Sequence, residues 1–499
     1  MLSTDRPAPD EAPPLWAKVV DQSRCIGCHA CTTACRSENE VPLSVTRTYV
    51  KSVDVGVYPA ARRAFQVTRC NQCDDPPCVH ACPTAAMHRR SDGIVDFDKS
   101  VCIGCKACIA ACPYDAIFIN PEDHSAEKCN FCAHRLDAGL EPACVVVCPA
   151  EAILVGDLRD PTSRVAAYVD RDAVQVRRPE KATRPKLFYK GAHAATLDPL
   201  AAARPDGGLY MWSEQPQGPT EVGTGSRGAP ANSSAAAVVS YDVSHRMPWD
   251  WRVSLYTWTK GLAAGIYLAA LLLGMGSGWP VLTPLLSGAF LGLTGLILIA
   301  DLEHPLRFVL IFRRPQPRSW LVRGAAVISL YGLVLAAHLL LGLAGQVQAA
   351  RWLAIGGAPL AALTAVYTAF LFAQARGRDL WQSPLLAPHM LVQALVLGAA
   401  VQLLVGVAGA AWLLAAAAGA HLLLLAGEVT MGHPTAHARA AAHAMTGGRY
   451  ARWFWPGVAL AALGAAAPWI GPVAAIPALA AILAHEHAYV QAGQSVPLA

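Results

Sequence analysis

The chain carries sixteen cysteines, and all of them fall between Cys25 and Cys148 of its 499 residues. They form four groups: Cys25-x2-Cys28-x2-Cys31-x3-Cys35, Cys70-x2-Cys73-x4-Cys78-x3-Cys82, Cys102-x2-Cys105-x2-Cys108-x3-Cys112 and Cys129-x2-Cys132-x11-Cys144-x3-Cys148. Thiols at this density can pair as disulfides, bind zinc or bind iron–sulfur clusters. The four groups are therefore the first candidates for chemistry in this chain.

The spacing inside the groups favours iron–sulfur clusters. In the first and third groups, three closely spaced cysteines are followed by a fourth, a run that binds one cubane and gives its last thiolate to a second cluster. Proline follows Cys82, Cys112 and Cys148, and it biases each of them away from helical geometry. Zinc sites do not require this pattern, and disulfides are unstable in a reducing cytoplasm. Sixteen thiolates, four to a cluster, predict four [4Fe–4S] clusters and no spare thiol.

These motifs resemble the electron-transfer subunits of complex iron–sulfur molybdoenzymes, such as dimethyl sulfoxide, polysulfide and thiosulfate reductases. The stretches CNQCDDPPCVHACPTAAMHRRSDGIV and CIGCKACIAACPYDA are close to that family's pattern, and the resemblance extends over 20–190. It implies an α+β, ferredoxin-like double dicluster domain in which paired clusters exchange their fourth ligands. The implied ligand sets are Cys25, Cys28, Cys31 and Cys148; Cys129, Cys132, Cys144 and Cys35; Cys70, Cys73, Cys78 and Cys112; and Cys102, Cys105, Cys108 and Cys82.

The rest of the chain has the composition of a membrane protein. Over the whole sequence 54% of residues are apolar and 15% are charged, whereas a soluble domain has about 25% charged residues. Most of the apolar stretches have about the 20 residues that a helix needs to cross a bilayer. They lie near 253–276, 281–300, 321–345, 352–373, 385–408, 410–428, 453–469 and 470–490. We therefore expect an all-α polytopic domain of about eight transmembrane helices in a lipid bilayer.

Arginines in the connecting loops predict the orientation. The loops on the side of the cysteine-rich head hold ten arginines, and the opposite loops hold only Arg351. The ten are Arg307, Arg313, Arg314, Arg318, Arg323, Arg376, Arg378, Arg439, Arg449 and Arg452. Positive loops stay on the cytoplasmic side, and the first twenty residues lack the pattern of an export signal. We expect a bacterial inner (cytoplasmic) membrane protein with its head in the cytoplasm.

The apolar part has its own family resemblance. LYTWTKGLAAGIYL, ADLEHPLRFVLIFRRPQPRSWLVRGA and GEVTMGHPTAHARAA resemble the quinone-handling membrane subunit of polysulfide reductase, in the NrfD family. The resemblance implies eight helices and a quinone, which would be either menaquinone or ubiquinone. Ionisable side chains in spans are functional candidates. On the head side these are Lys260, Asp301, His304 and Glu428, which could bind the quinone and exchange its protons. Snorkelling or ion pairing at the interface is the alternative for each.

Histidines in the spans raise the question of a b-type haem, which needs two axial imidazoles. His338 and His421 lie at different depths and cannot share one iron, whereas His389 and His421 match in depth. We do not expect haem here, and we interpret these residues as hydrogen-bonded core histidines or as part of a proton route.

The predicted organisation is an N-terminal extension over 1–19, a four-cluster domain over 20–190, a flexible linker over 191–250, a membrane quinone domain over 251–490 and a C-terminal tail over 491–499. The predicted function is electron transfer between a molybdopterin catalytic subunit and the membrane quinone pool. The alternatives are a module of an alternative complex III-like or hydrogenase-linked respiratory complex, and a membrane-tethered electron carrier without quinone chemistry. The net charge of +5, with no basic stripe, gives no reason to expect a nucleic-acid partner.

Overall fold

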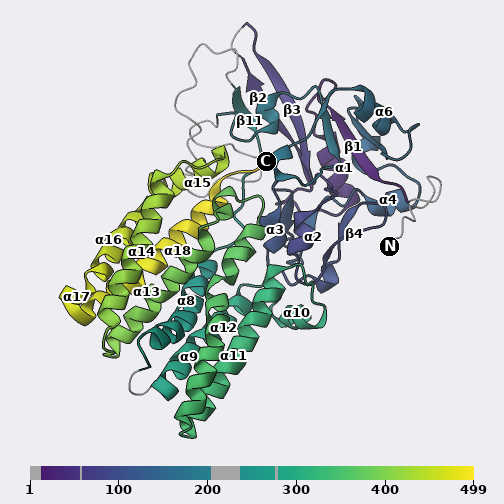
Figure 1. Ribbon diagram of the computed structural model, residues 1–499. Coiled ribbons are helices and arrows are strands. Elements are labelled where there is room, and N and C mark those ends of the chain that lie inside the picture. Colours follow the sequence, from purple (N-terminus) through teal and green to yellow (C-terminus); the bar gives the residue numbers. More distant parts are fainter. Residues whose placement is uncertain (1–12, 57–58, 204–236, 276–278) are drawn as a thin grey trace, which may run out of the picture. The chain divides into compact units, whose positions relative to one another are not determined.

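The computed structural model describes residues 13–56, 59–203, 237–275 and 279–499 (Figure 1). The chain divides into two compact units, which are described separately. Unit 1 comprises Met1–Arg246 together with Pro497–Ala499, and unit 2 comprises Met247–Val496.

The main sheet of unit 1 is built around β1 (Trp16–Asp21), whose residues are almost all buried. Beside it lie β8 (Ile153–Asp157), which is antiparallel, and β10 (Leu187–Lys190), which is parallel; β9 (Val174–Gln175) pairs with β10. The strand that opens the described chain is thus held between two strands that follow the last cysteine. This pairing closes the cysteine-rich segment into one domain.

A second sheet has the order β11-β2-β3, formed by Ala237–Tyr241, Thr48–Val55 and Arg62–Arg69. Strand β11 and the short helix α7 (Ala194–Leu197) both fall within the expected linker over 191–250. Residues 204–236 of that linker lie outside the described residues. Part of the expected linker therefore has secondary structure and contributes a strand to unit 1.

Short helices and two hairpins follow the cysteine loops. The helices are α1 (Ala30–Glu38), α2 (Pro77–Ala81), α3 (Ala107–Ala111), α4 (Ala133–Asp137) and α5 (Ala143–Val146). The hairpins are β4 (Met87–Arg89) with β5 (Val95–Phe97), and β6 (Ile117–Ile119) with β7 (Ala126–Lys128). Helix α1 packs against α5, and α2 packs against α3. These contacts bring the first cysteine group to the fourth and the second to the third.

Unit 2 is a bundle of helices (Figure 1). Helices lie near all eight expected positions: α8 (Trp251–Leu272), α9 (Trp279–Ala300), α11 (Trp320–Leu343), α12 (Val347–Gln374), α13 (Leu386–Leu404), α14 (Ala410–Thr430), α16 (Ala451–Ala465) and α18 (Ala475–Ser495). Among the described residues, six segments are long and apolar enough to cross a membrane. They are Trp279–Ala300, Trp320–Leu343, Val347–Gln374, Leu386–Leu404, Ala410–Thr430 and Ala467–Ser495.

Two of the eight helices, α8 and α16, are not long and apolar enough to count as candidate spans, and the reason differs between them. Helix α8 has 22 residues, but polar side chains such as Arg252, Thr257 and Lys260 occupy its first half. Helix α16 has 15 residues, which span only about 22 Å. The structure therefore supports a multi-pass membrane protein with six candidate spans, and the count of eight stays a prediction.

Most residues of helix α8 are buried, because it packs against α9, α12, α13 and α18. Its contact with α13 is unusually close at two glycines. A Cβ on Gly265 would lie 1.8 Å from the carbonyl oxygen of Ala394, and one on Gly398 would lie 1.9 Å from the carbonyl oxygen of Gly265. Small residues let membrane helices approach backbone to backbone. This approach holds the second half of α8 closely against α13.

The outer faces of the bundle remain apolar. Large side chains such as Leu333, Trp412 and Leu423 are exposed, and Leu423 has 75% of its surface accessible. An aqueous surface rarely carries so much contiguous apolar area, whereas lipid accommodates it readily. This distribution agrees with a bundle that presents many large apolar side chains to a bilayer.

Candidate functional sites

The first and third cysteine groups have the same local backbone. In each group the residue before the second cysteine is a glycine with φ of 70° (Gly27 and Gly104), and the residue after it is left-handed (His29 and Lys106). Only glycine adopts that conformation without steric cost, so both loops need it before the second cysteine. The two loops turn the chain sharply, so that three thiols come from seven residues. The sequence identity Cys-Ile-Gly-Cys therefore corresponds to a structural repeat.

Electrostatic effects identify the neighbours of the thiols in the first and fourth groups. Burial raises the pKa of Cys25, and the charge of Cys148 from the fourth group raises it further. Burial also raises the pKa of Cys35, and the largest effect from another thiol is that of Cys129. Cys148 of the fourth group thus lies near Cys25 of the first group, and Cys35 of the first group lies near Cys129 of the fourth.

The second and third groups are related in the same way. Burial raises the pKa of Cys78, and among the thiols that raise it further is Cys112 from the third group. Burial raises the pKa of Cys108, and Cys105 and Cys82 raise it further. All sixteen thiols are free, and most are buried, while Cys28 is exposed. Anionic ligands that lie together and away from water are costly unless a cation or a metal cluster binds them.

The donor set suits a multinuclear centre. Among the residues that the structure describes, no three His, Cys, Asp or Glu side chains are arranged to hold a single metal ion. A cubane differs from a single ion because each of its four irons takes one thiolate. Backbone N–H groups already point at several of the sulfurs. Met87 donates to Cys82 at 3.4 Å, and Ala152 donates to Cys148 at 3.2 Å.

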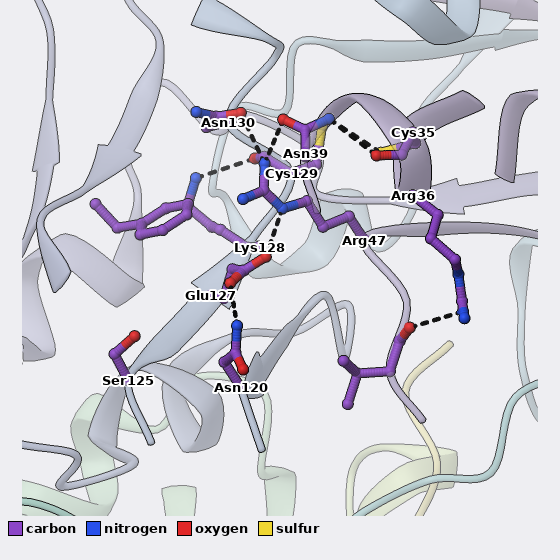
Figure 2. Close-up of polar contacts among 12 residues, drawn as sticks. Cys35, Arg36, Asn39, Arg47, Asn120, Ser125, Glu127, Lys128, Cys129 and Asn130 are labelled. Atoms are coloured by element: carbon purple, nitrogen blue, oxygen red, sulfur yellow. Dashed lines mark hydrogen bonds and ion pairs between the residues drawn. The ribbon is translucent and has the colours of Figure 1, made fainter. Parts of the chain in front are cut away.

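A buried polar network joins the first group to the fourth (Figure 2). Arg47 donates from Nε to Oε1 of Glu127 at 2.7 Å and from Nη1 to the side-chain oxygen of Asn39 at 2.7 Å. The amide nitrogen of Asn39 lies 3.7 Å from the sulfur of Cys35 and 3.6 Å from that of Cys132. Burial alone would raise the pKa of Glu127, but Arg47 is the largest influence that holds it below its usual range. The network orients the helix that carries two thiols of the first group.

In unit 2 the structure buries Lys260 completely. Its Nζ donates to the carbonyl oxygen of Ala365 at 2.9 Å and to the hydroxyl of Thr368 at 2.7 Å, and it lies 4.7 Å from the ring centroid of Tyr367. Lys260 and Glu486 of α18 line the same small cavity, which has room for about one water molecule. A lysine held in this way is part of the bundle core and does not snorkel to the surface.

The other three quinone candidates lie at helix ends. Asp301 directly follows α9 and is buried, and His304 precedes the short 3-10 helix Pro305–Val309. Among the described residues, Nε2 of His304 is buried without a hydrogen-bond partner. Glu428 lies in the last turn of α14 and is half-buried. The hydrogen bonds of Lys260 go to α12, so a single site for all four residues stays a prediction.

Sequence reasoning missed two residues of α18, Glu486 and His485. Glu486 shares the cavity of Lys260, and the ring of His485 lies 5.1 Å from those of both His389 and His421. His389 Nε2 and His421 Nδ1 are hydrogen-bonded at 2.8 Å. The rule that singles out ionisable residues in spans would have found Glu486, had it been applied to the last span. His338 lies elsewhere, hydrogen-bonded to the hydroxyl of Tyr267 at 3.1 Å.

Clustered thiols on one unit and an apolar helical bundle on the other define a membrane-anchored iron–sulfur electron-transfer protein. Comparisons with known proteins agree for both units. Residues 62–158 match the family model of the 4Fe-4S dicluster domain, and residues 240–485 match that of polysulphide reductase, NrfD. The chain belongs to the family of reductase iron–sulfur subunits, here joined to an NrfD-family membrane domain.

Several curated relatives resemble the cysteine-rich part. One subunit of the tetrathionate reductase of Salmonella typhimurium is 46% identical over 209 residues, which are 40% of this chain and 80% of that protein. One chain of the polysulfide reductase of Wolinella succinogenes is 42% identical over 176 residues, 35% of this chain and 92% of that protein. The arsenate respiratory reductase iron–sulfur subunit of a Shewanella species is 34% identical over 219 residues, 34% of this chain and 94% of that protein. The prediction of an iron–sulfur subunit with an NrfD-type anchor is confirmed.

Proposed function

We propose that this chain carries electrons between a molybdopterin catalytic subunit and the membrane quinone pool. Unit 1 is proposed to be a ferredoxin-like double dicluster domain with four [4Fe–4S] clusters, which would accept and release single electrons. The observation that carries the proposal is the presence, in one chain, of sixteen thiols gathered across their groups and an NrfD-family membrane domain. Because both parts belong to one chain, the proposed electron path runs from the head to the membrane domain within one protein.

The proposed ligand sets cross between groups. One set is Cys25, Cys28, Cys31 and Cys148, and its pair is Cys129, Cys132, Cys144 and Cys35. The other pair is Cys70, Cys73, Cys78 and Cys112 with Cys102, Cys105, Cys108 and Cys82. The packing of α1 on α5 and of α2 on α3 supports these sets, as do the thiol neighbours described above.

The proposed quinone chemistry depends on ionisable groups of unit 2. Lys260 has an ammonium group beside a cavity that also contains Glu486, and a quinone carbonyl takes hydrogen bonds from such a donor. Asp301, His304 and Glu428 are proposed to exchange protons with water on the head side. The quinone itself would be menaquinone or ubiquinone, and the arginine distribution supports a head in the cytoplasm of a bacterium.

The test uses the full chain in liposomes with and without menaquinol or ubiquinol. Quinol should reduce clusters of the head, or quinone should oxidise dithionite-reduced clusters, as followed by electron paramagnetic resonance. Liposomes that lack quinone should give no change. If quinone leaves the clusters unaltered in both directions, the chain is an electron carrier without quinone chemistry.

A second experiment identifies the catalytic partner and the orientation. A tagged chain purified from its own membranes should bring down a subunit that contains molybdenum or tungsten and a pterin. A cytochrome c or a hydrogenase subunit in its place would favour the respiratory-complex alternative. Protease added to right-side-out vesicles should leave the head intact, and cleavage of the head would overturn the proposed topology.

A further inference from the structure

Two cationic side chains converge on one thiol in the interior of unit 1. The Nη1 atom of Arg69 donates to the sulfur of Cys144 at 3.0 Å, and Nζ of Lys18 donates to the same sulfur at 3.6 Å. Arg69 is 2% exposed and Lys18 is fully buried, with its ammonium 4.0 Å from the ring centroid of Phe131. Cys144 thus accepts hydrogen bonds from two buried cations.

The guanidinium of Arg69 has further hydrogen-bonding capacity. Within the described part of the chain, its Nε and Nη2 atoms are buried and have no hydrogen-bond partner. Donors of a buried cation are costly to leave unpaired, because the group has lost water and gained nothing in return. A cubane with four thiolate ligands is anionic and exposes sulfide acceptors on its faces. The residues present therefore fit such a cluster beside Cys144 and leave donors for its sulfides.

We propose that Arg69, assisted by Lys18, is the residue that raises the reduction potential of the cluster bound by Cys35, Cys129, Cys132 and Cys144. This inference rests on the proposed ligand sets. Reduction adds one negative charge to a cluster that is already anionic, and a buried cation in hydrogen-bond contact favours the reduced form. Net charge and hydrogen bonds to sulfur are the established means by which proteins set such potentials.

The effect should be selective because the other buried cations lie by other thiols. Three thiols raise the pKa of Arg69 through their charge. The strongest effect is that of Cys144, followed by Cys129 and then by Cys31 of the neighbouring set. Lys128 instead lowers the pKa of Cys78, which belongs to the second cysteine group. Each pair of cysteine groups thus has a buried cation near its thiols. Arg69 is the cation near the thiols of the first and fourth groups.

The test is a redox titration of the purified full chain, followed by electron paramagnetic resonance. Arg69→Met should lower the midpoint potential of one cluster by at least 59 mV. For a one-electron couple, this corresponds to a tenfold change in the ratio of reduced to oxidised cluster at fixed potential. The cluster of Cys31 should shift less, and the other two should not move. Arg69→Lys keeps the charge and should retain most of the potential. Arg63→Gln removes an exposed arginine from the same strand and should shift no cluster.

Two further variants separate the tuning role from the ligand assignment. Cys144→Ser and Cys35→Ser should remove the same signal, and it should be the signal that Arg69→Met shifts. If the two serine variants remove different signals, the ligand sets are wrong. If they remove the same signal and Arg69→Met leaves its midpoint unchanged, the tuning role is wrong.

Lys18→Met is the second charge-removing variant, in case Arg69→Met does not retain its cluster. It should lower the same midpoint, by less than Arg69→Met, because its contact with the sulfur is longer. Loss of the cluster in both methionine variants, with full iron content in Arg69→Lys, would show that the cations are needed for assembly. That result would overturn the tuning role.

Discussion

The two units of this chain organise their functional residues in opposite ways. In unit 1 the thiols come in short runs, so that a loop of seven residues supplies three of them, as in Cys25–Cys31. In unit 2 the ionisable candidates are separate in sequence, and Lys260, Asp301 and Glu428 belong to three different helices or helix ends. A site made by one loop can be recognised from spacing, whereas a site made by several helices depends on how those helices pack.

The units also differ in how they accommodate buried charge. Unit 1 places ions of opposite sign in direct contact, as in the pair of Arg47 and Glu127 at 2.7 Å. Unit 2 gives the ammonium of Lys260 neutral acceptors, the carbonyl of Ala365 and the hydroxyl of Thr368, and puts Glu486 at the same cavity. A cation with neutral acceptors can lose or gain a proton without breaking an ion pair. The arrangement in unit 1 suits rigidity, whereas the proton exchange proposed for unit 2 would use a lysine whose hydrogen-bond acceptors are neutral.

The largest expected effect is the complete loss of one cluster in Cys148→Ser. Iron should fall from about 16 to about 12 atoms per chain, because each cubane holds four irons. The lost signal should be the one that Cys25→Ser removes, since Cys148 lies close enough to Cys25 to raise its pKa. If Cys148→Ser instead removes the signal that is lost in Cys129→Ser, the ligands do not cross between groups. A value near eight in the unaltered chain, or bound zinc, would exclude four clusters.

The next effect concerns the buried ion pair of unit 1. Arg47→Met removes one of the two cations that pair with the buried carboxylate of Glu127 and leaves Lys99 at 2.8 Å, so it should destabilise the domain by about 1.5–3 kcal/mol, the range for a lost hydrogen bond to a charged group. The double variant Arg47→Met/Glu127→Gln removes both charges and should recover much of that loss. Denaturant unfolding, followed by the visible absorbance of the clusters, measures the difference. Equal stability of the single variant and the unaltered chain would mean that the pair does not hold the domain together.

The same contrast explains what could be predicted from the sequence. The cysteine spacing predicted the cofactor class and the domain that carries it, because the loops at Gly27 and Gly104 depend only on local conformation. Apolar stretches predicted helices near all eight positions, since length and hydropathy are local properties as well. They did not predict that Thr257 and Lys260 of α8 would be buried in the bundle, which depends on how α8 packs against the other helices.

Residues joined only by tertiary packing were not predictable. Glu486 and His485 are adjacent on α18, yet they lie beside residues of different helices, Lys260 on α8 and His389 on α13. The strand β11 lies in a stretch whose composition indicates a linker, and it pairs with β2, about 180 residues earlier in the chain. In both cases the partner is remote in sequence, and no local pattern identifies it.

A smaller effect is expected from Asp301→Asn, which keeps the size of the side chain and removes its exchangeable charge. Quinone-linked turnover should fall by about 10²-fold, at the lower end of what a lost acid–base group costs. Electron transfer from a dye to the clusters should remain intact, since unit 1 is unaltered. Glu303→Gln removes a carboxylate two residues away and serves as the matched control. Normal quinone turnover in Asp301→Asn would exclude this residue from the mechanism.

The smallest effect tests whether burial or contact distance determines how much a charge pair contributes to the stability of unit 1. Arg63 and Asp54 form a pair with the same 2.7 Å contact as Arg47 and Glu127, but both side chains are about half exposed. Arg63→Gln should therefore cost about 0.2–1 kcal/mol, because water screens the pair. The hydrogen bond from Arg63 holds the pKa of Asp54 below its usual range.

That depressed pKa also gives the pH dependence its sign. The contribution of Asp54 to stability is complete above its unfolded pKa of about 3.9 and is lost only as pH falls through the lower, folded value. The stability difference between Arg63→Gln and the unaltered chain should thus stay constant from about pH 8 to pH 6, where the carboxylate is ionised in both states. Denaturant midpoints at those two pH values measure it. A cost as large as that of Arg47→Met would mean that contact distance, and not burial, determines how strongly a charge pair stabilises this domain.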